Sequence, residues 1–174
     1  MKLYLIGSLR NPAVPHLAEK IRQATGFEVF DDWFAAGPEA DDKWRDYERA
    51  RGHDMTEALA GYAANHVFEY DKHHIDTSEC GVVVLPAGKS GHIEAGYMLG
   101  RGKPVFLLYA EEPERFDVMY KFFTGIFTDL DALIARLQRL EQRATLVPYH
   151  EPTVEEWLED VEDVRRERLR TISP

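Results

Sequence analysis

The sequence predicts one α/β domain over residues 1–174, of the flavodoxin-like or Rossmann-like class, with a parallel sheet of about five strands. Its most apolar segments are short, and segments with helical spacing separate them. These apolar segments are KLYLIG at 2–7, CGVVVL at 80–85 and KPVFLLY at 103–109. Strands that are apolar on both faces need cover on both sides, so we expect helices on both faces of the sheet.

The first thirty residues read as strand, helix and strand, and an insertion follows them. The strand at 2–7 ends in a glycine turn, residues 12–25 have helical spacing, and a short strand covers 27–30. Residues 31–70 then interrupt the alternation with aromatic side chains and two charged helical segments. An insertion of this kind usually forms a lid or a partner surface, and we expect an inserted helical lid over the site.

The alternation of strands and helices resumes after the insertion. The longest buried strand, at 80–85, leads through a loop of small residues into a helix that carries Glu94. The elements expected after it are a strand at 103–109, a helix near 114–123, a short strand near Ile126, a helix at 129–143 and a strongly charged C-terminal helix at 151–170.

The composition excludes several functional classes. A formal net charge of -10 argues against a general nucleic-acid binder, whose affinity rests on neutralising phosphates. No apolar run approaches the roughly twenty residues of a membrane span, and the N-terminal residues are too interrupted for an export signal. A single cysteine, Cys80, excludes an intramolecular disulfide and fits a reducing cytoplasm. We therefore expect a cytoplasmic protein with a small ligand, and neither nucleic acid nor membrane as a partner.

The stretch Gly-Lys-Ser at 88–90 looks like the end of a phosphate-binding P-loop. That motif needs a glycine five positions before Gly88, and this chain has Val83 there. Pro86, in the intervening residues, also removes a backbone donor that the phosphate cradle would use. We therefore reject a P-loop, and another chemistry must explain the loop.

Sheets of the predicted class bind ligands beyond the carboxyl ends of their strands, where the strand order reverses. This rule brings three loops together, at 7–12, 31–33 and 86–91. The substrate-binding residues that we expect in these loops are Gly7, Ser8, Arg10, Asp32, Trp33, Gly88, Ser90 and Gly91.

Glu94 is the candidate nucleophile. We expect it in the first turn of its helix, capped by Ser90 or Gly91, where the helix dipole keeps a carboxylate ionised. A carboxylate placed in this way is suited to attack a sugar carbon and form a covalent intermediate. An acidic first-turn residue that only interacts with the dipole remains the structural alternative.

Two segments, EYDKHHIDTSECGVVVL and SGHIEAGYMLGRGKPV, resemble motifs of the nucleoside 2-deoxyribosyltransferase family. Asp71 precedes Gly81 by ten residues, Glu94 and Gly96 lie in a turn like that of the family's nucleophile, and Lys-Pro-Val at 103–105 opens the next strand. The likeness covers roughly the first 110 residues. It implies cleavage of the N-glycosidic bond of a 2′-deoxynucleoside or deoxynucleotide, with transfer of the deoxyribosyl group to a free nucleobase, in a homo-oligomer.

The resemblance also implies roles for three residues. Glu94 resembles the nucleophile on the anomeric carbon, Asp71 the acid that assists departure and return of the base, and Tyr4 the tyrosine that positions the nucleophile. We expect Tyr4 at the end of the first strand. Two structural alternatives stay open: Asp71 as a surface acid that starts a helix, and Tyr4 as an ordinary half-buried strand aromatic.

The first loop resembles a related group of enzymes. GSLR at 7–10 is similar to the Gly-Ser-Ile-Arg of deoxynucleoside monophosphate N-glycosidases, in which the arginine helps to bind the 5′-phosphate. This implies that Arg10 and Ser8 bind a phosphate, with Lys89 or Ser90 adding donors at a helix N-terminus. Arg10 as a solvated surface cation is the alternative. Transfer to water, and a nucleotide-binding module without turnover, both remain open.

The loop before Glu94 departs from the transferases. They carry an additional acid there that helps to hold the base, whereas this chain has Gly88, Lys89 and Ser90, so base recognition must differ. Aromatic side chains of the insertion either stack on a base or pack on the sheet; they are Trp33, Phe34, Trp44 and Tyr47. The histidines have no zinc-site spacing, and the chemistry needs no metal or organic cofactor.

Overall fold

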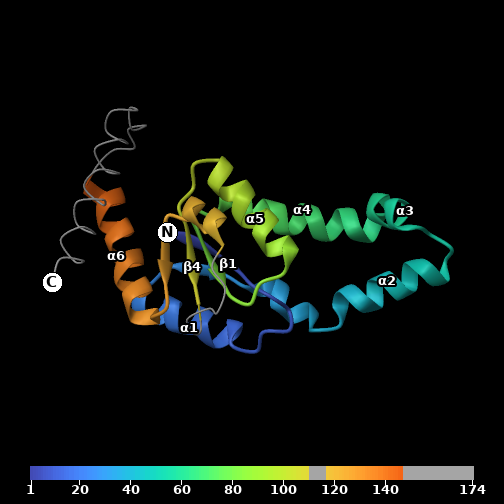
Figure 1. Cartoon of the computed structure of the whole chain (residues 1–174), viewed down its shortest axis with the longest axis horizontal. Helices are drawn as coiled ribbons and strands as arrows, with labels where there is room; N and C mark the ends of the chain where they lie inside the picture. Colours follow the sequence, from blue (N-terminus) through green and yellow to red (C-terminus); the bar gives the residue numbers. More distant parts are fainter. Residues whose placement is uncertain (110–116, 147–174) are drawn as a thin grey trace. The chain divides into compact units, whose positions relative to one another are not determined.

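The computed structural model describes residues 1–109 and 117–146, and its centre is a sheet of five parallel strands (Figure 1). The strand order is β2-β1-β3-β4-β5, which is the flavodoxin-like order, and it reverses between β1 and β3. The strands are β1 (Lys2–Ile6), β2 (Glu28–Phe30), β3 (Cys80–Val84), β4 (Val105–Leu108) and β5 (Gly125–Phe127). The predicted parallel α/β sheet is confirmed, with the apolar strand β3 at its centre.

Helices cover the two faces of the sheet. On one face, α4 (Tyr62–Thr77) and α5 (Lys89–Gly100) enclose a core that includes Tyr4, Phe30, Ile75 and Met98 (Figure 1). The helices α1 (Val14–Thr25) and α6 (Leu130–Leu146) supply further buried residues, among them Ile21 and Leu133. The central strands β1, β3 and β4 are therefore buried on both sides, as their continuous apolar sequences require, whereas the edge strand β5 is partly exposed.

Close packing of α5 against the sheet depends on a glycine. A Cβ at Gly81 in β3 would lie 2.9 Å from the sulfur of Met98 in α5. The first residue of β3, Cys80, is fully buried, and burial raises the pKa of its thiol to about 12. The centre of the sheet thus leaves no room for larger side chains below α5.

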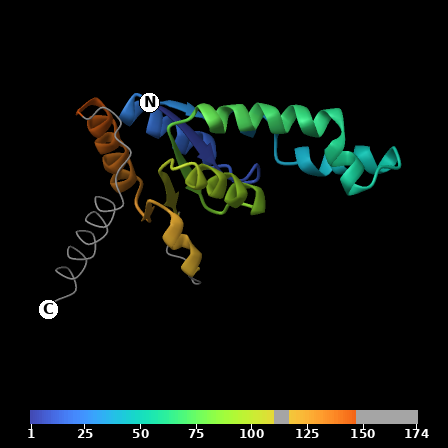
Figure 2. The same ribbon diagram turned by 90° about the horizontal axis from the view of Figure 1, so that it is seen from above.

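The insertion contains more helix than the sequence predicts. Its elements are a 3-10 helix η1 (Asp32–Ala36), α2 (Ala40–Ala50), α3 (Met55–Ala60) and the first half of α4. We call residues 37–70 the helical arm, and both views show α2 and α3 reaching away from the sheet (Figures 1 and 2). Asp54 and Glu57 begin α3 with a reciprocal capping box. The arm has no boundary at Tyr70, because α4 continues through it to Thr77.

The remaining expectations are confirmed in part. The short strand near Ile126 is β5, and the helix expected at 129–143 is α6. A helix expected near 114–123 falls partly on residues 110–116, outside the described residues, and the rest is a 3-10 helix η2 (Val118–Phe122). The charged helix expected at 151–170 also lies outside the described residues. Within the described ranges, no helix combines the length and the apolar character that crossing a membrane requires.

Candidate active site

The three loops that we expected to meet do lie together at the carboxyl ends of β1, β2 and β3. A Cβ at Gly91 would lie 2.9 Å from Cγ2 of Ile6 and 3.8 Å from the carbonyl oxygen of Gly7. A Cβ at Gly7 would in turn lie 3.3 Å from the ring of Trp33. The indole Nε1 of Trp33 donates a hydrogen bond of 2.8 Å to the carbonyl of Leu5. Both glycines thus permit the close approach that joins the loops.

Glu94 lies one turn further along its helix than the sequence predicts. Helix α5 begins at Lys89 with Gly88 as its N-cap, so neither Ser90 nor Gly91 is the cap and Glu94 is in the second turn. Burial raises the pKa of Glu94 to about 7, and the charge of Asp71 raises it further. The expectation that the helix dipole keeps Glu94 ionised is wrong, because the dipole acts mainly within the first turn and burial outweighs it.

Asp71 lies in the middle of α4, so the alternative that it starts a helix at the surface is wrong. Burial raises the pKa of Asp71 to about 6. Helices α4 and α5 pack against each other, and the charge of Asp71 acts on Glu94. Two partly buried carboxyl groups from different elements therefore face the same space.

Tyr4 interacts electrostatically with both carboxyl groups. It occupies the middle of β1 rather than its end, and at 1% exposed it is a fully buried strand aromatic rather than a half-buried one. Its ring stacks on Phe30 with the centroids 5.2 Å apart. The pKa of Tyr4 is raised far above its ordinary value, first by burial and then by the charges of Glu94 and Asp71. The phenol and the two carboxyl groups thus form one electrostatically coupled cluster.

This cluster is suited to acid–base chemistry near neutral pH. Two interacting carboxyl groups titrate as a pair, so between about pH 6 and pH 7 the pair of Asp71 and Glu94 tends to hold one proton. One carboxyl group can then act as an acid while the other acts as a nucleophile or base. Separating two such roles is what cleavage of a glycosidic bond requires.

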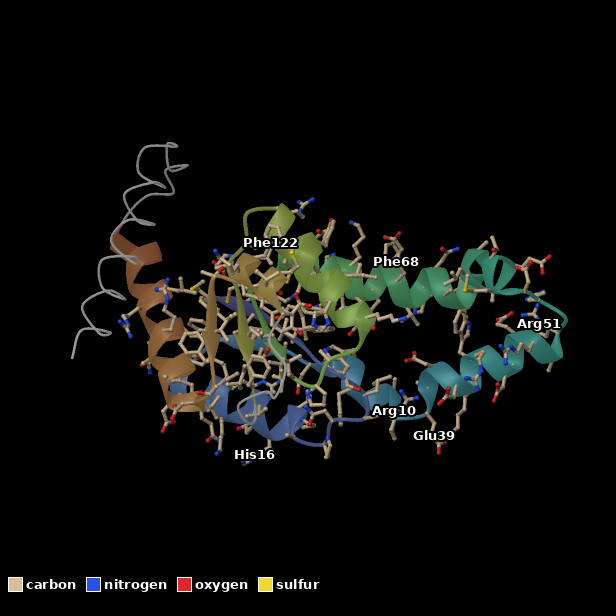
Figure 3. The ribbon with its side chains drawn as sticks, viewed as in Figure 1. Arg10, His16, Glu39, Arg51, Phe68 and Phe122 are labelled. Carbon is tan, nitrogen blue, oxygen red and sulfur yellow. The ribbon has the colours of Figure 1, made fainter. Side chains whose placement is uncertain are left out.

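Arg10, in the loop after β1, is held by the helical arm. Its Nη2 donates a 2.8 Å hydrogen bond to Asp42 in α2, although the Arg10 side chain is 60% exposed. Ser8 Oγ accepts a hydrogen bond of 3.2 Å from the backbone N–H of Arg10 and so shapes the loop locally. Arg10 is therefore an exposed surface cation that is paired with Asp42. Figure 3 shows it at the base of the arm.

The loop before α5 exposes its small residues. Gly88, Lys89 and Ser90 are all exposed, and Gly91 is buried against β1. The carbonyl of Gly88 accepts a hydrogen bond of 2.9 Å from Nδ1 of His92. The side chain of His92 also stacks on Tyr120 of η2, which brings η2 to the N-terminal half of α5. Sequence patterns gave no sign of this contact, because the two residues lie in different elements without a shared motif.

Asp32 is the first residue of η1. It is exposed in η1, where its charge acts on His74 of α4. The pKa of His74 is nevertheless lowered, above all by burial. Its neighbour Asp31, which the sequence did not single out, pairs with Arg22 of α1 and fixes the start of the insertion.

The aromatic residues of the insertion divide between two environments. Trp33 and Phe34 are half-buried and contact each other edge to face, with ring centroids 5.9 Å apart. Tyr47 is 60% exposed on α2, beside the guanidinium of Arg51. Trp33 is thus the one that the described contacts place at the loops of the site. Among the described side chains, no three His, Cys, Asp or Glu residues group closely enough to hold a metal ion.

Solved structures of nucleoside-processing enzymes resemble this chain. A 2-deoxyribosyltransferase from the psychrotolerant bacterium Bacillus psychrosaccharolyticus aligns with a TM-score of 0.53 and 19% identity, over 77% of this chain and 90% of the other. A CMP N-glycosidase from Clostridium botulinum aligns with a TM-score of 0.46 and 13% identity, over 79% of this chain and 98% of the other. No protein-family model and no curated protein sequence matches the chain.

These comparisons bear on the fold. At 19% identity the first likeness establishes a shared architecture and leaves the activity open, and the second has too low a TM-score to carry an argument. The transferase belongs to the family that the motifs at Asp71 and Glu94 resemble. Sequence motifs and three-dimensional fold therefore lead to the same family of structures.

Proposed function

We propose that this chain cleaves the N-glycosidic bond of 2′-deoxynucleosides, or of their 5′-monophosphates, and transfers the deoxyribosyl group to another nucleobase. The observation that carries the proposal is the coupled pair of Asp71 and Glu94, with raised pKa values of about 6 and about 7 at the carboxyl end of a parallel sheet. Family resemblance at both residues and the fold of a 2-deoxyribosyltransferase support it.

In the proposed reaction the pair reacts in the singly protonated form that has the proton on Asp71, and the ionised carboxylate of Glu94 attacks C1′ of the sugar. The C1′–N bond breaks, its electron pair stays on the base, and Asp71 supplies the proton that the departing base needs. A covalent deoxyribosyl ester on Glu94 remains. A second base then attacks C1′ and releases Glu94, while Asp71 takes up the proton that this base loses. Buried Tyr4 acts as the residue that positions Glu94.

The same intermediate also permits hydrolysis, which is the second candidate function. Water attacking C1′ in place of a base would give free deoxyribose or its 5-phosphate. The sequence GSLR at 7–10 favours this candidate, because it resembles monophosphate N-glycosidases. Transfer instead requires that the site retains a base and excludes water. We propose that the insertion at 31–70 acts as a lid for this purpose: Trp33 lies at the loops of the site, whereas α2 and α3 reach away from the sheet in the structure and would have to close over it.

Binding roles are assigned to the loops. In this proposal Gly7, Ser8 and Arg10 hold the 5′ end of the substrate. The sugar and base lie along the remaining predicted residues, which are Asp32, Trp33, Gly88, Ser90 and Gly91. No metal or organic cofactor takes part in the proposed steps. The buried free Cys80 fits a protein of the reducing cytoplasm.

We also propose that the protein is a homo-oligomer. Large apolar side chains of α3 and α4 are exposed in the single chain, among them Met55 at 76%, Tyr62 at 85% and Phe68 at 59%. A helix with apolar residues on most sides is usually buried in a core or an interface. A second copy that covers the arm is therefore the arrangement that we expect, and sedimentation of a monomer at micromolar concentration would exclude it.

A base-exchange assay tests the function. The protein is incubated with each 2′-deoxynucleoside, or each 5′-monophosphate, together with a different free base, and the products are separated by chromatography. A new nucleoside indicates transfer, whereas free base and free sugar without a new nucleoside indicate hydrolysis. If the ligands bind and nothing is turned over, the proposal is wrong and the chain is a nucleotide-binding module.

A further inference from the structure

The ion pair between Arg10 and Asp42 connects two parts of the chain that lie far apart in sequence. Arg10 belongs to the loop after β1, and Asp42 belongs to the first turn of α2 in the helical arm. Among the described residues, no other side-chain hydrogen bond or ion pair joins α2 to a residue outside the helical arm. The arm therefore places a carboxylate on the arginine to which the proposed function assigns the 5′-phosphate.

Asp42 is held in this position from both sides. Its Oδ2 accepts from Arg10 at 2.8 Å, and its Oδ1 accepts from Nη1 of Arg45 at 2.8 Å. Arg45 in turn pairs with Asp46, the next residue of the same helix. Because Arg45 stays bound to two acids, Asp42 remains directed towards the loop and does not point freely into solvent.

We propose that Asp42 is a specificity-determining residue, whose carboxylate competes with a substrate 5′-phosphate for Arg10. This inference rests on the proposed function, and it names Asp42 as the group that limits the use of monophosphates relative to nucleosides. A nucleoside carries no phosphate and leaves the ion pair intact. A monophosphate must displace Asp42 from Arg10, or else bind with two anions beside one guanidinium.

The physical argument is one of charge. A guanidinium binds carboxylate and phosphate oxygens through the same donors, so an anion already bound reduces the gain from a second one. Both side chains are well exposed, at 60% and 46%, so the ion pair is weak and a dianion can displace it. Removing the carboxylate should therefore raise the preference for monophosphates by a modest factor, roughly two- to fivefold.

Asp42 could also have the opposite role and orient Arg10 for the phosphate. In that case removing its carboxylate would lower the preference for monophosphates instead of raising it. The contacts favour competition, because the Arg10 nitrogen that Asp42 occupies is a terminal Nη2, one of the groups that a phosphate would use. A double-mutant cycle with Arg10 separates an effect through this arginine from a general effect of charge on the arm.

The experiment compares Asp42→Asn with a matched control, Asp41→Asn, in which the same charge is removed from the preceding residue. Wild type, both single variants, Arg10→Ala and the double variant Arg10→Ala with Asp42→Asn are measured. Two quantities are recorded for the four 2′-deoxynucleosides and their 5′-monophosphates: kcat/KM, and Kd by isothermal titration calorimetry. Each is expressed as the ratio of monophosphate to nucleoside.

We expect Asp42→Asn to raise this ratio two- to fivefold, through KM and Kd rather than kcat. Asp41→Asn should leave the ratio within experimental error, and Asp42→Asn should have no effect once Arg10 is alanine. A lower ratio, an unchanged ratio, or an equal rise in the Arg10→Ala background would overturn the proposal. Failure to bind monophosphates in both wild type and Asp42→Asn would overturn it too. Absence of turnover with the expected shift in Kd would reject only the enzymatic function.

Discussion

The two halves of α4 differ in how they are held. Residues 71–77, the packed half, are held by the loop before β4 and by α5: Lys103 Nζ donates to the carbonyls of Ile75 and Asp76, at 2.9 and 2.7 Å, and Tyr97 donates to the Asp76 carboxylate at 2.8 Å. Residues 62–70 are exposed apart from Ala64. Phe68 in this half is 59% exposed, and Figure 3 shows it on the outer part of the helix.

This difference shows where a catalytic carboxyl group can be placed. Asp71 is the first residue of the packed half, so it gains the burial that raises its pKa and the fixed position that faces Glu94. Two residues earlier, Glu69 also carries a carboxyl group and lies exposed in the arm. Burial thus distinguishes two acids on one helix. The packed half carries the proposed acid, while the exposed half offers an apolar surface.

The largest effect on turnover is expected at Glu94, whose carboxyl group interacts with that of Asp71. Glu94→Ala removes the proposed nucleophile, and we expect turnover to fall by at least about a thousandfold. The base-exchange assay measures the loss, and circular dichroism checks that the fold persists. Glu69→Ala, which removes a carboxylate from the exposed half, is the matched control and should retain wild-type turnover. Substantial activity in Glu94→Ala would exclude the assigned nucleophile.

Asp71→Asn should lower kcat/KM by roughly 10²- to 10⁴-fold, because the departing base loses its proton donor. The pH profile sharpens this prediction. In the wild type, kcat/KM should fall below about pH 6, where the pair takes up a second proton, and above about pH 7, where it loses its only one. In Asp71→Asn the alkaline limb should disappear. A profile that keeps both limbs would contradict the role of Asp71 as the acid.

The two hydrogen bonds from Lys103 to the packed half can be removed without changing Asp71 or Glu94. Lys103→Met removes two hydrogen bonds to the C-terminal carbonyls of α4 while keeping an apolar stem of similar length. Hydrogen bonds from a charged donor contribute about 1.5–3 kcal/mol, so we expect the free energy of unfolding to fall by that order. Urea denaturation measures it. An unchanged midpoint of urea denaturation would show that these two hydrogen bonds do not stabilise the packed half.

Glu94→Gln should stabilise the protein at alkaline pH. The folded-state pKa of Glu94, about 7, is above its ordinary value of 4.5, so the folded protein loses stability as the pH rises from about 4.5 through 7. Glutamine does not titrate. The variant should therefore match wild type at pH 4.5 and exceed it by about 1–3 kcal/mol at pH 8. Equal stability at both pH values would mean that burial imposes no penalty on the Glu94 charge.

The smallest effect on the single chain is expected in the exposed half. Phe68→Ser changes a side chain that is 59% exposed, so we expect the free energy of unfolding of the isolated chain to change by no more than about 0.5 kcal/mol. If the exposed half is an interface, the variant should shift the sedimentation profile towards the monomer. A large loss of stability in a monomeric sample would show instead that Phe68 packs within its own chain.

The sequence was sufficient for the sheet, because strands such as β3 are apolar throughout and only a doubly covered parallel sheet accommodates them. The start of α5 was misplaced. Ser90 and Gly91 look like caps, but the helix begins after Gly88, whose backbone is extended and whose cap involves no side-chain hydrogen bond. A pattern search therefore finds the helix and misses its first residues.

The site was predictable only where a motif carries it. Asp71 and Glu94 were found because their spacing resembles a known family, and the structure brings them together. Their titration depends on burial, which no spacing reports. The contact of Arg10 with Asp42 spans 32 residues and joins two exposed side chains, so it leaves no periodic trace in the sequence. Long-range pairing on a surface has to be seen in three dimensions.

The burial of Cys80 makes the chain convenient for site-directed labelling. Thiol-reactive dyes attack the thiolate, and a fully buried thiol whose pKa is raised to about 12 presents almost none of it at neutral pH. A cysteine introduced at an exposed position of the arm, such as Ala63→Cys, would therefore be modified selectively in the native protein. A fluorophore there would report changes in the surroundings of the arm, with the native cysteine left in place.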